Sequence, residues 1–111
     1  MTRLNLPKPL EQYFATTNSG NLEGLLACFT PDARVHDEGQ WIHGRAALAE
    51  WAQKSRAKYN FTAYPQAVEQ SSEVQPVVLA EVTGSFPGSP LDLRFHFTLD
   101  NGAIDALDIK P

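Results

Sequence analysis

The most constraining feature of the sequence is a strict alternation near the C-terminus, in LDLRFHFTLDNGAIDALDI. Apolar and polar residues take turns there, which is the period of a strand with one buried face; the apolar set is Leu91, Leu93, Phe95, Phe97 and Leu99. Asp100-Asn101-Gly102 follows, and Asn and Gly tolerate the positive φ of a hairpin turn. Ile104 to Ile109 is the returning strand. This region predicts an antiparallel hairpin with an apolar inner face.

Two more extended segments precede this hairpin. Phe61 to Tyr64 predicts a strand that reaches a sheet edge or a bulge at Pro65, because proline cannot donate to a strand ladder. Ala67 to Glu73 continues that strand into a polar turn. Val77 to Phe86 predicts a further strand, and Pro87-Gly88-Ser89-Pro90 has the composition of a turn.

The N-terminal half predicts helices instead. The first begins at Pro9 and has one apolar face with the spacing i, i+3, i+4, i+7: Leu10, Tyr13, Phe14 and Thr17. It ends at Asn18-Ser19-Gly20, because Gly20 adopts a left-handed cap at little cost. Asn21 then caps a second helix, which runs over Leu22, Leu25, Leu26 and Phe29 and closes in a turn at Pro31-Asp32.

A third helix is predicted from about Arg45 to Lys58, with one apolar face: Leu48, Trp51, Ala52 and Ser55. Three helices followed by a mostly antiparallel sheet indicate an α+β fold. The chain is 111 residues long, so we expect one domain, residues 1–111, with a single core.

Asp37 has an unusual position between the second and third helices. Ala33, Val35 and Asp37 alternate with Arg34, His36 and Glu38, which is the period of a short strand. By parity, Asp37 shares the face of the two apolar residues. Gly39 permits a turn after it, and Trp41 is expected in a loop before the third helix. The pattern therefore turns one carboxylate toward the interior.

Composition excludes several classes of partner. The formal net charge is −4 and there is no Lys/Arg cluster, which argues against nucleic acid. No apolar run approaches the ~20 residues of a membrane span. The N-terminal segment lacks the apolar region of a secretory signal, and Cys28 is the single cysteine, so we expect a cytoplasmic protein.

The chain resembles the nuclear transport factor 2-like superfamily, and within it the SnoaL-like polyketide cyclases and ketosteroid isomerases. The residues that carry the resemblance are Tyr13, Asn18-Ser19-Gly20-Asn21-Leu22, Phe29-Thr30-Pro31-Asp32-Ala33, Asp37 and Gly44-Arg45. The hairpin from Phe95 to Ile104 matches the closing hairpin of that family. The resemblance is more specific for the fold than for the chemistry, because this fold hosts enzymes and binding proteins alike.

The resemblance implies a cone in which a strongly curved sheet wraps around the helices and encloses an apolar pocket. It places Asp37 where ketosteroid isomerases have their proton-shuttling aspartate, and Tyr13 where they have a tyrosine that donates to the developing oxyanion. Their second oxyanion donor falls on or near Phe95, a departure that argues against steroid isomerisation. The resemblance also implies homodimers through the outer face of the sheet.

A set of mostly aromatic residues is expected to form the wall of the pocket: Phe14, Trp41, His43, Trp51, Tyr59, Phe61, Phe95 and Phe97. His36, Asp37, Glu38 and His43 are close in sequence, but no metal site is expected, because His36 and Asp37 point to opposite faces of a strand. By the same parity, His96 is expected on the outer face, away from Phe95 and Phe97.

Two functions are compatible with these features. The first is a cofactor-independent isomerase or cyclase, in which Asp37 takes a proton α to a carbonyl of an apolar substrate and Tyr13 steadies the enolate. The second is a non-catalytic pocket or dimerisation module. In a purely structural role, Asp37 would bond to backbone donors or to Arg45, and Tyr13 would be core.

Overall fold

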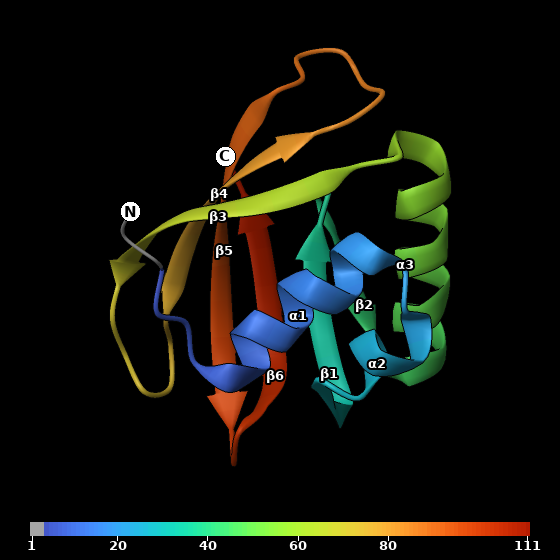
Figure 1. Ribbon diagram of the computed structural model, residues 1–111. Helices are drawn as coiled ribbons and strands as arrows, with labels where there is room; N and C mark the ends of the chain where they lie inside the picture. Colours follow the sequence, from blue (N-terminus) through green and yellow to red (C-terminus); the bar gives the residue numbers. More distant parts are fainter. Residues whose placement is uncertain (1–3) are drawn as a thin grey trace.

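The computed structural model describes residues 4–111, so Met1 to Arg3 of the expected domain lie outside the described residues. Three helices pack on a six-stranded sheet (Figure 1). The expected α+β architecture is confirmed. In chain order the elements are α1 (Lys8–Ser19), α2 (Leu22–Leu26), β1 (Phe29–Asp37), β2 (Gln40–His43), α3 (Arg45–Tyr59), β3 (Thr62–Gln70), β4 (Val77–Thr83), β5 (Leu91–Asp100) and β6 (Ala103–Lys110).

The sheet has the strand order β2-β1-β6-β5-β4-β3. All neighbours pair antiparallel except β1 and β6, which are parallel. Figure 1 shows the strong twist of this sheet, with β3 crossing the direction of β6 and α1 lying over one face. No helix in residues 4–111 is long and apolar enough to cross a bilayer.

The core is an aromatic cluster between α1 and β5. Tyr13 and Phe14 of α1 meet Phe95 and Phe97 of β5 with ring centroids 5.2 to 6.2 Å apart, mostly edge to face. This is the preferred geometry of aromatic pairs, because the positive ring edge meets the negative ring face. All four side chains are buried. The apolar face of α1 therefore packs against the inward-facing residues of β5.

Two predictions of local structure are wrong, and the first concerns the end of α2. The helix stops at Leu26, and the segment from Phe29 through Pro31 and Asp32 belongs to β1. Phe29 pairs with Ile104 of β6, and the next paired residue is Arg34, so a bulge lies between them. Pro31 falls in that bulge, where its missing N–H breaks no ladder hydrogen bond.

The second wrong prediction is the loop around Trp41. Trp41 lies in strand β2, which forms a hairpin with β1 in which Asp37 pairs with Gln40. The two turn residues, Glu38 and Gly39, have φ of 52° and 77°. Positive φ at both central residues is what a tight two-residue hairpin requires.

Other turn predictions are confirmed. Gly20 caps α1 with φ of 74°, and Asn101 and Gly102 form the β5–β6 turn with φ of 51° and 79°. The ladder of edge strand β3 shifts register after Pro65, as expected for a proline bulge.

Asn18 at the end of α1 ties the helix to β3. Its side-chain amide donates to the carbonyl of Ala63 at 2.8 Å, and its amide oxygen accepts from the N–H of Ala63 at 2.9 Å. Ala63 is buried, so its backbone groups need partners inside the protein. The side chain therefore pairs with the edge of β3 in place of a neighbouring strand.

Asn18→Ala is expected to lower the free energy of unfolding by about 2 kcal/mol, because it removes both bonds and leaves two backbone groups of Ala63 unpaired. Chemical denaturation measures this change. Ser19→Ala is the control, because Ser19 is exposed and surface changes are usually within about 0.5 kcal/mol. Equal stabilities of the two variants would contradict the bridging role of Asn18.

Candidate functional site

A cavity of about 490 Å³ lies between α3, α1 and one face of the sheet. Its size falls in the range of about 300–1,000 Å³ that is typical of small-molecule sites. Most of the lining is apolar. The lining residues are Tyr13, Asp37, Glu38, Trp51, Ser55, Tyr59, Phe61, Val82, Phe86, Pro87, Leu91, Leu93, Phe95, Ile109, Lys110 and Pro111.

Asp37 lies at the end of β1, on the same face as the fully buried Ala33 and Val35. Its carboxylate accepts a hydrogen bond from the indole Nε1 of Trp51 on α3, at 3.0 Å. Burial raises the pKa of Asp37, and the Trp51 hydrogen bond opposes part of that rise. The site therefore holds a carboxyl group that is more basic than an exposed one and has one oxygen already positioned.

Tyr13 lies on α1, and its side chain is 3% exposed. Burial raises the pKa of its phenol well above the usual range, and the charge of Asp37 adds to this rise, while the hydroxyl of Thr17 opposes it. The phenol thus stays protonated at neutral pH. Tyr13 and Asp37 both line the cavity, so one site combines a residue that can donate a hydrogen bond with a carboxylate that can accept a proton.

Arg45 does not neutralise Asp37. Its guanidinium donates to the backbone carbonyl of Phe29 at 3.0 Å. The ion pair between Arg45 and Asp37 that a structural role would use is therefore not formed.

The structure brings six of the expected site residues to the cavity lining: Tyr13, Asp37, Trp51, Tyr59, Phe61 and Phe95. Phe14 and Phe97 are not in the lining, because both are buried in the core cluster behind Tyr13 and Phe95. Both residues were expected in the pocket wall, but they belong to the core.

Trp41 and His43 also lie outside the cavity lining. In the β1–β2 hairpin, Trp41 pairs with His36 and His43 pairs with Arg34, so both share the outward parity of their partners. Trp41 is 58% exposed. Both residues were expected in the pocket wall, but they lie on the outer face of the sheet.

Some lining residues were missed in the sequence. Ser55 follows Trp51 by one helical turn, and Leu91 and Leu93 have the parity of Phe95, so the periodicity contained a signal for these three. Glu38 carried no such signal, because strand alternation points it outward. It reaches the cavity because it lies in the turn and not in the ladder.

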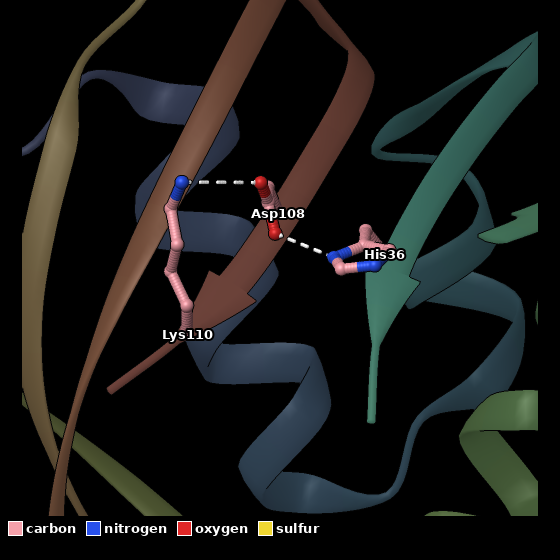
Figure 2. A network of polar contacts seen from close by, with 3 residues as sticks. All are labelled: His36, Asp108 and Lys110. Atoms are coloured by element: carbon pink, nitrogen blue, oxygen red, sulfur yellow. Dashed lines mark hydrogen bonds and ion pairs between the residues drawn. The ribbon is translucent and has the colours of Figure 1, made fainter. Parts of the chain in front are cut away.

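The opposite face of the sheet carries a polar network (Figure 2). Asp108 accepts from His36 Nδ1 at 2.9 Å and lies 3.4 Å from the ammonium of Lys110. Burial alone would raise the pKa of Asp108, but the bonds to His36 and Lys110 bring it below the usual range. His36 and Asp37 thus serve different faces of the sheet.

Comparison with known proteins identifies the family and the fold of this chain. The model of the SnoaL-like domain family matches residues 10–106. A structure from Sinorhizobium meliloti, described as a candidate polyketide cyclase, is 32% identical, has a TM-score of 0.90 and is covered over 95% of each chain. No curated protein matches the chain.

Two further structures show the same fold at lower identity. A protein with a ketosteroid isomerase-like fold from Catenulispora acidiphila, in complex with trimethylamine, is 16% identical with a TM-score of 0.83, over 96% of this chain and 87% of that chain. An NTF2-like protein from Cytophaga hutchinsonii is 10% identical with a TM-score of 0.78, over 97% and 90%.

The raised pKa of Asp37 makes a prediction about stability. The folded protein retains a proton on Asp37 at pH values where the unfolded chain has released it. The free energy of unfolding is therefore expected to lose this contribution as pH rises from about 4 through the folded pKa of Asp37. Denaturation curves at several pH values measure it, and Asp37→Asn should lack this component. An unchanged pH profile in that variant would assign the effect to other carboxylates.

Proposed function

The chain belongs to the SnoaL-like domain family, and from that premise we propose that it is an enzyme that transfers a proton on an apolar, carbonyl-containing substrate. Asp37 is the acid–base group. One observation carries the proposal: the carboxyl group of Asp37, with a raised pKa, lies in the lining of a largely apolar cavity that Tyr13 also lines. Such an environment strengthens hydrogen bonds to a developing charge.

The reaction follows from the two polar groups. Asp37 accepts a proton from the carbon α to the carbonyl, the bond electrons move onto the carbonyl oxygen, and Tyr13 donates a hydrogen bond to that oxygen. Asp37 then returns the proton to another carbon of the same substrate. Trp51 donates a hydrogen bond to Oδ2 of Asp37 at 3.0 Å, and we assign the proton transfer to Oδ1. A proton leaves and returns without any change of oxidation state, so this chemistry needs no cofactor.

Phe95 limits the choice of substrate. Its ring lies 6.1 Å from the ring of Tyr13 and cannot donate a hydrogen bond to an oxyanion. A missing oxyanion donor costs roughly 10²–10³ in rate. We infer that the substrate compensates with an acidic carbon, as between two carbonyls of a 1,3-diketone. The candidate polyketide cyclase among the similar structures supports this substrate class.

The proposal is tested by exchange of carbon-bound protons in D2O, followed by NMR, with a panel of apolar ketones and 1,3-diketones. Asp37→Asn is expected to lower the exchange rate by about 10²–10⁴, and Tyr13→Phe by about 10². Asp32→Asn, an exposed carboxylate on β1, is the matched control. If the Asp37→Asn variant catalysed proton exchange on every active compound at the wild-type rate, the proposed mechanism would be refuted.

The alternative is a non-catalytic binding module of the same fold. The absence of a second oxyanion donor at Phe95 favours it. The same NMR experiment separates the two functions, because a binding module would shift its resonances with the panel without exchanging any proton.

We also propose that the outer face of the sheet joins a second copy of the chain. The support is the family resemblance together with Trp41, which is 58% exposed. The ring of His36 lies 4.9 Å from the Trp41 ring, and the guanidinium of Arg34 lies 5.5 Å from it. These neighbours hold the indole in place on the surface.

Light scattering is expected to give twice the chain mass of 12.3 kDa. Trp41→Glu should shift the protein toward the monomer, because it replaces an apolar contact with a charge that must lose water. Ala57→Glu on the exposed side of α3 adds the same charge elsewhere and should leave the mass unchanged. A monomeric wild type would refute the dimer.

A further inference from the structure

The cavity contains two carboxylates next to each other in sequence. Asp37 and Glu38 both line it, and each accepts one hydrogen bond from an aromatic residue of α3. The donor to Asp37 is the indole of Trp51, and the donor to Glu38 is the hydroxyl of Tyr59. Both donors are neutral, so these hydrogen bonds leave the negative charge of the cavity uncompensated.

Two lysines lie near these carboxylates, Lys110 and Lys58. Lys110 lies in the lining, but its ammonium is 3.4 Å from Asp108 in the network of the outer face (Figure 2). The ammonium of Lys58 lies 5.0 Å from the centroid of the Tyr59 ring, and Tyr59 and the charge of Glu38 raise the pKa of Lys58, so this lysine lies close to both residues. Lys58 is exposed, so water screens its effect on Glu38.

Arg45 and Arg56 bind backbone carbonyls. Arg45 donates to Phe29 and Arg56 donates to Thr17, and neither belongs to the cavity lining. Within residues 4–111, Lys110 is therefore the single cationic side chain in the lining, and Asp108 already holds it.

Aromatic rings surround the same carboxylates. The ring of Tyr59 meets Phe86 edge to face at 5.9 Å near Glu38, and Trp51 and Phe61 continue the wall. Aromatic faces carry partial negative charge and attract ammonium groups, most strongly where water is excluded. The carboxylates and the aromatic rings thus both favour a positively charged ligand.

The depth of the two carboxylates differs. Glu38 is exposed and lies at the rim, whereas Asp37 is partly buried beside the buried Tyr13. A ligand that reaches Asp37 with its carbonyl end leaves its other end near Glu38, Tyr59 and Phe86.

We propose that the substrate carries a positively charged nitrogen, as a protonated amine or a quaternary ammonium, that binds at the rim against Glu38, Tyr59 and Phe86. This inference rests on the proposed function for the reacting end of the substrate and adds the charge of its other end. Glu38 is then a specificity residue, and Asp37 remains free for proton transfer. An anionic substrate of the same shape is repelled by both carboxylates.

The test uses three probes of similar shape: benzyltrimethylammonium, its neutral carbon isostere neopentylbenzene, and the anion benzylsulfonate. The indole N–H resonance of Trp51 reports binding in an NMR titration at neutral pH. We expect the ammonium to bind about tenfold more tightly than the neutral isostere, and the anion to cause no shift.

Glu38→Gln is expected to lower the affinity for the ammonium probe about tenfold and to leave the affinity for the neutral probe unchanged. Glu50→Gln is the matched control, because Glu50 is exposed and pairs with Lys54 at 2.6 Å outside the cavity. It should change neither affinity.

Equal affinities for the ammonium and neutral probes, or a preference that survives Glu38→Gln, would overturn the inference. These outcomes are separate from failure of the proposed function. Proton exchange on neutral ketones that depends on Asp37, without a preference for ammonium, refutes this inference alone. A preference for ammonium without any exchange refutes the catalysis and leaves the cation site standing.

Discussion

The edge-to-face packing of α1 on β5 is the contact on which the rest of the molecule depends. Tyr13 and Phe14 cover the middle of the sheet at Phe95 and Phe97. The other end of β5, with Leu91 and Leu93, lines the cavity instead. One aromatic contact therefore sets where the sheet is filled, and the twist of the sheet leaves the remaining space open.

Asp37 gains its chemical character at a cost to stability. A carboxylate partly removed from water is less stable than an exposed one, and the hydrogen bonds from Trp51 and from the backbone of Glu38 return only part of the loss. Such a placement is typical of functional sites, where groups are kept in unfavourable surroundings. Packing in the surrounding core offsets the free-energy cost of this buried carboxylate.

The parts predicted correctly from the sequence depend on local rules. The Gly20 cap, the turn at Asn101-Gly102 and the inward parity of Asp37 follow from residues next to each other in the chain. The wrong assignment of Phe29 has the opposite cause. Its spacing fits a helix, but its pairing with Ile104 lies far along the chain and no local pattern reveals it. Trp41 was misplaced because the register of a hairpin decides the face of each residue.

The parallel pair of β1 and β6 has a consequence for how the protein is made. The strand that carries Asp37 pairs with β2, which follows it directly, and with β6, the last strand of the sheet in chain order. Such long-range pairing gives a high contact order, which slows folding because a large loop must close first. During synthesis, β1 acquires this strand neighbour only after β6 has left the ribosome. The incomplete chain thus lacks the cavity, and the appearance of the site coincides with completion of the sheet.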